Sequence, residues 1–196
     1  MLEQIIDDVD RALDNEAYFA ALTLVLTLPD ICGKAQYPET IGKNRYINWY
    51  DENIGKYEKC PCEHCKEVQM PYLSGEVIYS LRNSMLHQGT PNIDNKVIKN
   101  TANKIDQFVL VIEKKKPFGI YVDSAGIASS DFNDITTREY RVNVRRLCLI
   151  ICASAKGYYE NNKEKFNFFN YSILDWDAEI VRLENLKHGG MGDDRF

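Results

Sequence analysis

The sequence predicts a mainly α protein, a single-domain helical bundle over residues 1–196 with a small β-hairpin inserted into it. A chain of 196 residues fits one compact core. Hydrophobic residues make up 44% and charged residues 27%, which is typical of a globular domain and not of a disordered chain. Most of the chain repeats its apolar residues every three or four positions, and only one segment has a strand-like composition.

Two helices are expected at the start of the chain. Over residues 2–13 apolar side chains recur at helical spacing, and acidic side chains occupy the other face. Asp14 and Asn15 offer an N-cap for the apolar run 16–28, which stops at Pro29. This run is shorter than the roughly 18 residues of a membrane span, so we expect a buried helix and no membrane insertion. The N-terminus does not resemble a secretory signal, which favours a cytoplasmic protein.

The middle of the chain is expected to alternate between helix and loop. A short aromatic-bearing helix is predicted over 44–54, followed by a polar, cysteine-bearing loop over about 55–72. The next helix has the clearest boundaries in the chain. Ser74 suits its N-cap, and Gly89 suits the left-handed position after its last turn.

The second half of the chain contains the only strand-like segment. β-Branched and aromatic residues dominate 107–123, which predicts the β-hairpin. Helical periodicity returns over 134–161. A last helix is expected over about 175–187, before a glycine-rich tail.

The helix after Ser74 carries a polar group suited to chemistry. Asn83 and His87 are four residues apart and share a helix face, and Arg82 can reach the same space. Ser80 and Ser84 are predicted beside them. Histidine exchanges protons near neutral pH, and the planar fork of arginine suits a phosphate or a developing phosphorane. We therefore take Arg82, Asn83 and His87 as the candidate catalytic residues.

Arg82-Asn83-x3-His87 resembles the signature of the HEPN (higher eukaryote and prokaryote nucleotide-binding) superfamily, Arg-x4–6-His with a polar residue directly after the arginine. The resemblance covers these six residues and the mainly helical order of the chain. It implies a metal-independent endoribonuclease without a cofactor, in which two motifs face each other across a homodimer. On this chain it implies that Arg82 contacts the scissile phosphate, His87 moves protons to or from the 2′-hydroxyl or leaving oxygen, and Asn83 supports both.

The same resemblance implies a toxin or antiviral defence role, with RNA as substrate and an antitoxin or regulatory protein as a partner.

Two alternatives to Arg82 and His87 as a catalytic pair stay open. Arg182 and His188 also meet the spacing but lack the polar residue after the arginine. Arg82 and His87 would equally suit a solvated helix face, and the protein would then be a non-catalytic helical module that binds a nucleotide or a protein partner.

Three of the six cysteines gather in the loop before this helix. Cys60, Cys62 and Cys65, together with His64, are ligand types of structural zinc. The spacing nevertheless favours an exposed thiol loop, because adjacent His64 and Cys65 seldom share one ion and no second cysteine pair follows. Cys148 and Cys152, four residues apart in an apolar stripe, are expected in the core.

The net charge of −5 argues against broad coating of nucleic acid. Local basic residues would guide an RNA backbone if they flank the Arg82/His87 helix, or would simply form solvated ion pairs. They are Lys96, Lys99, Lys104, Lys114, Lys115, Lys116, Arg138, Arg141, Arg145 and Arg146.

Aromatic residues that could stack on bases or fill the core are Tyr46, Trp49 and Tyr50. The sequence lacks P-loop, G-x-G-x-x-G, G-x-S-x-G and H-E-x-x-H motifs, which excludes the commonest nucleotide, hydride, acyl and zinc-hydrolase classes.

Overall fold

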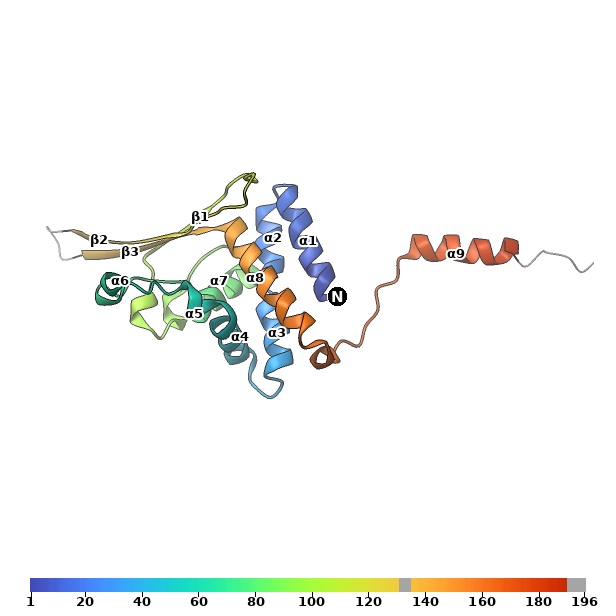
Figure 1. The fold of residues 1–196 in the computed structure, drawn as a ribbon, viewed down its shortest axis with the longest axis horizontal. Coiled ribbons are helices and arrows are strands. Elements are labelled where there is room, and N and C mark those ends of the chain that lie inside the picture. The colour runs from blue at the N-terminus through green and yellow to red at the C-terminus, as the bar shows by residue number, and fades with distance from the viewer. Residues whose placement is uncertain (131–134, 190–196) are drawn as a thin grey trace, which may run out of the picture. The chain divides into compact units, whose positions relative to one another are not determined.

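The computed structural model describes residues 1–130 and 135–189, and contacts divide the chain into two units, Met1–Lys165 and Phe166–Phe196. The first unit is a set of packed helices with a small three-stranded sheet, so the protein is mainly α as predicted (Figure 1). The expectation of a single domain over 1–196 stays a prediction.

Six longer helices build the first unit. They are α1 (Leu2–Asp14), α2 (Tyr18–Val25), α3 (Leu28–Gln36), α4 (Gly42–Tyr50), α7 (Gly75–Gln88) and α8 (Val144–Glu160). Helix α8 packs against α1, α2 and α3, and α4 packs against both α3 and α7. Trp49, Tyr46 and Leu147 are among the fully buried side chains between them. The helix expected over 2–13 is confirmed as α1.

The apolar run 16–28 does not form the single helix expected. Helix α2 ends at Val25 and α3 begins at Leu28, so the run is broken in the middle. Pro29 lies in the first turn of α3, where its missing N–H costs no intrahelical hydrogen bond. Proline therefore starts a helix here instead of ending one.

Among the described residues, the stretch Tyr18–Gln36 is long and apolar enough to cross a membrane by length and composition. In the protein, 56% of its most apolar window is buried. Core helices of soluble proteins pass the same test, so the stretch is weak evidence for a membrane span.

The short helix expected over 44–54 is confirmed as α4, which continues as the π-helical turn η1 (Asp51–Gly55) and then as α5 (Lys56–Glu58). The loop expected over 55–72 is only partly a loop, because it also contains α6 (Glu63–Glu67). Three further short turns are 3₁₀ helices: η2 (Asn95–Val97), η3 (Thr101–Asn103) and η4 (Lys163–Phe166).

The β-hairpin predicted over 107–123 is wrong. The strands are β1 (Gln107–Val111), β2 (Ser124–Ser130) and β3 (Ile135–Asn143), in the order β1-β3-β2. Strand β3 is antiparallel to β2 and parallel to β1, so the central strand lies where a helix was expected from residue 134. In β3, buried Tyr140 and Val142 alternate with exposed Arg141, the period of a strand with one covered face. Hydrogen-bonded pairing of β3 with a strand on each of its edges outweighs the helical spacing of apolar residues in this segment.

Strand β3 passes directly into α8, and a buried ion cluster fixes this junction. Asn143 caps α8 by accepting a hydrogen bond from the backbone N–H of Arg146 at 3.2 Å. The Arg146 guanidinium binds Glu58 of α5 at 2.8 Å and Asp123, just before β2, at 2.6 Å. Both carboxylates are more than 90% buried. One arginine therefore joins the helices to the sheet.

The second unit contains α9 (Trp176–Gly189), which confirms the last predicted helix. Its preceding segment carries an aromatic contact between Phe168 and Phe169, with ring centroids 4.4 Å apart. Within α9, Trp176 and Val181 are exposed.

Loss of the buried cation should destabilise the protein. We expect Arg146→Ala to lower the free energy of unfolding by about 3 kcal/mol at neutral pH, because two buried carboxylates lose their partner. Burial already raises the pKa of Asp123, and losing the guanidinium raises it further, so the deficit should shrink as pH falls and the carboxyl becomes protonated. Chemical denaturation at several pH values measures this.

Arg141→Ala is the matched control, because Arg141 lies on the same strand, is exposed and pairs with Glu139 at the surface. It should change stability by less than about 1 kcal/mol. Equal effects of the two substitutions would contradict the role assigned to the buried cluster.

Candidate functional site

Helix α7 forms where local signals predicted it. The Ser74 hydroxyl accepts a hydrogen bond from the backbone N–H of Val77 at 3.4 Å, and this satisfies a donor of the first turn. Gly89 follows the last turn with φ of 67°, a left-handed conformation that favours glycine. These caps set which residues of α7 face the neighbouring helices.

Two glycines let the helices around α7 approach one another closely. A Cβ on Gly75 of α7 would lie 2.6 Å from the carbonyl oxygen of Ile47 in α4. A Cβ on Gly33 of α3 would lie 2.7 Å from the carbonyl oxygen of Arg45 in α4. The Asp51 carboxylate also accepts the backbone N–H of Gly75 at 2.7 Å. Helices α3, α4 and α7 are thus held together at backbone contact.

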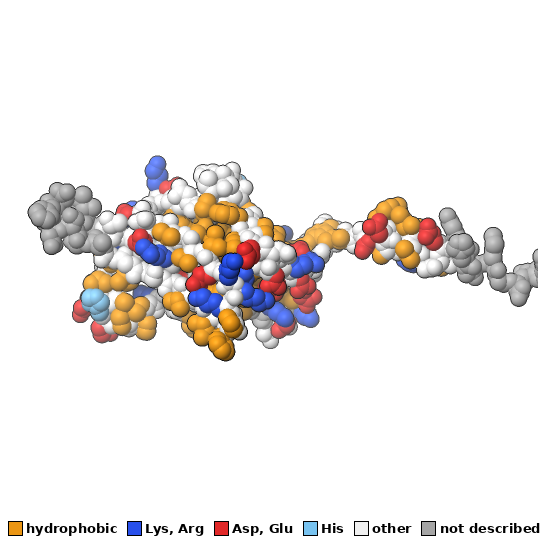
Figure 2. All heavy atoms as spheres, turned by 90° about the horizontal axis from the view of Figure 1, so that it is seen from above, with side chains coloured by type: hydrophobic (Ala, Val, Ile, Leu, Met, Phe, Trp, Pro, Cys, Tyr) orange, Lys and Arg blue, Asp and Glu red, His pale blue; other side chains and the backbone are white. Residues whose placement is uncertain are grey.

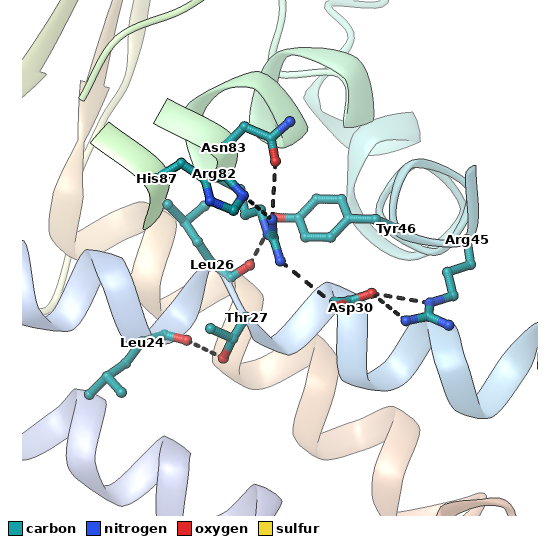
Figure 3. A network of polar contacts seen from close by, with 9 residues as sticks. All are labelled: Leu24, Leu26, Thr27, Asp30, Arg45, Tyr46, Arg82, Asn83 and His87. Carbon is teal, nitrogen blue, oxygen red and sulfur yellow. Dashed lines mark hydrogen bonds and ion pairs between the residues drawn. The ribbon is translucent and has the colours of Figure 1, made fainter. Parts of the chain in front are cut away.

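The three predicted site residues meet at one guanidinium group (Figure 3). Arg82 Nη1 donates to Asn83 Oδ1 at 3.1 Å and lies 3.5 Å from His87 Nε2. Because the guanidinium can only donate, a hydrogen bond between these two groups would have His87 Nε2 as its acceptor. Arg82 is about four-fifths buried, whereas His87 is exposed. The structure therefore brings Arg82, Asn83 and His87 together.

The structure adds two residues that the sequence did not indicate. Asp30 of α3 lies 4.0 Å from Arg82 Nη2, and it accepts two hydrogen bonds from Arg45 of α4 at 3.0 and 3.1 Å (Figure 3). Two guanidinium groups thus share one carboxylate, which leaves one positive charge in excess. Arg82 Nε is buried and has no hydrogen-bond partner among the described residues, a feature that it shares with core atoms such as Trp49 Nε1. No local signal joins residues so far apart in sequence.

The neighbours proposed for this polar face are instead structural. Ser80 and Ser84 are buried, and the Ser80 hydroxyl accepts the backbone N–H of Asp94 at 2.7 Å. Ser80 therefore anchors the loop after α7 and does not join the site.

The three aromatic residues considered for base stacking are fully buried and belong to the core. Tyr46 lies beneath the guanidinium network, and its hydroxyl donates to the carbonyl oxygen of Leu26 at 3.1 Å (Figure 3). Burial raises the pKa of Tyr46 above its ordinary value, and the nearby charge of Arg82 opposes this rise. Tyr46 therefore remains a neutral hydrogen-bond donor, and the stacking role is excluded for Tyr46, Trp49 and Tyr50.

Most of the basic residues considered as RNA guides are committed to structural contacts. Arg145 is buried and donates to the carbonyl oxygens of Leu13 and Glu113, each at 2.8 Å. On the face drawn in Figure 2, acidic and basic side chains are interspersed. Paired with acidic groups or backbone carbonyls are Lys115, Lys116, Arg138, Arg141, Arg145 and Arg146.

Of the remaining lysines of this series, Lys114 is exposed between β1 and β2. The other three, Lys96, Lys99 and Lys104, are exposed on the loop after α7, which is bound to the other end of that helix. The backbone N–H of Lys99 donates to Glu76, in the first turn of α7. His87 lies eleven residues further along the helix, roughly 16 Å at 1.5 Å per residue. Lys99 is therefore held at the end of α7 opposite to His87.

The rival motif lies on α9 in the second unit. Arg182 of α9 forms an ion pair with Glu179 at 3.3 Å, one turn away, and its side chain is mostly exposed. The side chain of His188 lies outside the described residues. Of this pair only the Arg182 side chain is described, and it contacts Glu179.

The cysteine loop forms a second candidate centre. The sulfur atoms of Cys60, Cys62 and Cys65 all lie within 4.8 Å of one another. Cys62 Sγ accepts the backbone N–H of Cys65 at 3.3 Å. Hydrogen bonds from the Cys65 thiol, from this N–H and from the Cys60 thiol lower the pKa of Cys62 to about 7. Donating to Cys60 and to Cys62 raises the pKa of Cys65. By contrast Cys148 and Cys152 are core residues, as expected.

Comparison with protein-family models finds no matching family, and neither curated proteins nor solved structures give a significant match. The site is therefore interpreted from its own geometry.

The shared carboxylate should limit the affinity of this site for anions. In Asp30→Asn the two guanidinium groups lose their common counter-charge, so an anion should bind between them more tightly. We expect phosphate to raise the melting temperature of this variant about 2–4 °C more than that of the wild type. Thermal unfolding with and without phosphate measures this.

Asp14→Asn is the control for this experiment, because Asp14 pairs with Lys115 at an exposed site on α1. It should respond to phosphate as the wild type does. An equal response of Asp30→Asn and Asp14→Asn would show that the arginine pair does not form an anion site.

Proposed function

We propose that the protein is a HEPN-like, metal-independent endoribonuclease that acts as a homodimer in the cytoplasm. Arg82, Asn83 and His87 are its catalytic residues. We further propose that it has a toxin or antiviral defence role and that an antitoxin or regulatory protein controls it.

The convergence of the motif on the Arg82 guanidinium is the observation that carries this proposal. His87 Nε2 lies 3.5 Å from Arg82 Nη1. An RNA phosphate bound by the guanidinium fork would bring its neighbouring 2′-hydroxyl beside the imidazole. Asn83 Oδ1 accepts a hydrogen bond from the same nitrogen, Arg82 Nη1, at 3.1 Å, which limits how the arginine can turn.

The chemistry follows from these positions. A histidine removes the proton of the 2′-hydroxyl, whose oxygen attacks the adjacent phosphorus. Arg82 stabilises the negative charge of the phosphorane. The P–O5′ bond breaks, and the leaving oxygen takes a proton from a second acid. The products are a 2′,3′-cyclic phosphate and a 5′-hydroxyl end, and no metal ion is required.

One subunit supplies only one histidine to this reaction, whereas the reaction needs both a base and an acid. A twofold homodimer that places two α7 helices face to face would supply two. His87 is exposed near the C-terminal end of α7 and is accessible for such a contact. The dimer therefore completes the proposed site.

The second candidate is a non-catalytic helical module that binds a nucleotide or a protein partner. One observation favours it, because the Arg82 fork already contacts Asn83, His87 and Asp30 of its own chain. Such a module would be stabilised by its partner without turnover of RNA.

Catalysis should depend on the two charged motif residues. We expect His87→Ala and Arg82→Ala each to lower the cleavage rate of single-stranded RNA or tRNA by about 10²–10⁴-fold. The wild type should cleave in the presence of a metal chelator. A substrate with a deoxyribose at the cleavage site should resist cleavage, because it lacks the attacking hydroxyl.

His64→Ala is the matched control, because His64 is an exposed histidine outside the proposed site. It should cleave at the wild-type rate. Loss of activity in His188→Ala with full activity in His87→Ala would assign the reaction to the rival motif. A wild-type protein that leaves diverse RNAs intact would favour the non-catalytic module.

The dimer can be tested separately from catalysis. Light scattering should give twice the 22.6 kDa of one chain. Mixing wild-type protein with an excess of a chain carrying both Arg82→Ala and His87→Ala should reduce activity per wild-type chain, because mixed dimers hold an incomplete site. Activity that stays constant per wild-type chain would contradict a composite site.

A further inference from the structure

We propose that Cys60, Cys62 and Cys65 bind one zinc ion through three thiolates, with water in the fourth position. The three sulfur atoms come from separate positions of one short loop and converge to within 4.8 Å of one another. This site is independent of the proposed ribonuclease.

The spacing of the sulfur atoms matches a tetrahedral metal. A zinc–sulfur bond of about 2.3 Å places two tetrahedral thiolates about 3.8 Å apart. Cys60 Sγ and Cys62 Sγ lie 3.3 Å apart, and no pair of the three sulfur atoms exceeds the tetrahedral distance by more than about 1 Å, since all pairs lie within 4.8 Å. Side-chain movements of less than about 1 Å would therefore bring all three sulfurs to bonding distance. The imidazole of His64 is not part of this group, so it is not needed as a ligand.

The backbone around the thiols is already ordered for such a role. The carbonyl oxygen of Cys62 accepts the N–H of Lys66 at 3.2 Å, and that of Cys65 accepts the N–H of Met70 at 2.9 Å. The N–H of Cys65 points at Cys62 Sγ, a hydrogen bond that favours a thiolate. These bonds turn the chain so that its sulfur atoms face a common point.

Charge near the thiols supports the same conclusion. Three thiolates and one Zn²⁺ carry a net charge of −1. Lys59 and Lys66 line a cavity of about 130 Å³ together with Cys60 and Cys65, and they can offset this charge. Lys66 also pairs with Glu63 at 2.7 Å.

The loop has little else to hold it. Of the side chains from 59 to 69, Cys65 alone is half-buried and the others are exposed. A loop that buries so little apolar surface gains little from packing. One outside contact fixes its end, where Arg138 of β3 donates to the carbonyl oxygen of Gln69 at 2.7 Å. A metal would therefore stabilise the segment that leads into α7.

Zinc loading of the full-length protein tests the proposal. Protein purified under reducing conditions is stripped with a chelator, loaded with zinc and freed of excess metal. We expect one zinc ion per chain, and cobalt in its place should show thiolate-to-metal absorption. Metal should protect three thiols from a thiol reagent, whereas the buried Cys32, Cys148 and Cys152 should stay unreactive with and without metal.

Variants within the loop make the test specific. Cys62→Ser should weaken zinc binding at least about 100-fold, since losing a ligand costs at least as much as losing an outer-shell partner. His64→Ala and Glu63→Gln should bind zinc as the wild type does. No bound zinc after loading, or unchanged binding in Cys62→Ser, would overturn the proposal, as would loss of binding in His64→Ala.

Discussion

Backbone-to-backbone contact between α4 and its neighbours α3 and α7 determines the arrangement of the candidate site. At Gly33 and Gly75 a side chain of any size would meet a carbonyl oxygen of α4 at under 3 Å. Because these positions are glycine, Asp30 on α3, Arg45 on α4 and Arg82 on α7 come within reach of one another. Tyr46 and Trp49 fill the space between the helices. Wider helix spacing would separate the carboxylate from its two arginines.

The parts of the fold that the sequence predicted are those determined by local signals. The caps at Ser74 and Gly89 identify α7, and periodic apolar residues identify α1. Contacts between distant segments determine the parts that were mispredicted. The parallel pairing of β1 with β3 joins residues about 30 positions apart, and no turn sequence signals it. Pro29 was taken as a helix end because its position in the first turn of α3 depends on where α2 stops.

The candidate site likewise has a part that local sequence predicts and a part that only tertiary packing brings together. Arg82, Asn83 and His87 lie within six residues of one helix, so helical spacing alone brings them together. Asp30 reaches the Arg82 guanidinium, and Arg45 reaches Asp30, only through the packing of three helices, and neither residue is part of a motif. Burial also changed the interpretation of the basic residues. An arginine such as Arg145, which donates to two backbone carbonyl oxygens inside the protein, cannot guide RNA. The excess positive charge is therefore local, which agrees with an acidic chain.

The most direct test is a crystal structure of the His87→Ala protein with a short RNA whose 2′-hydroxyls are methylated. A ribonuclease of the proposed kind predicts two α7 helices facing each other across a twofold axis. A phosphate of the RNA should lie about 3 Å from the Arg82 guanidinium, within hydrogen-bond distance. Two copies of residue 87 that face separate solvent, or an RNA bound away from Arg82, would contradict it.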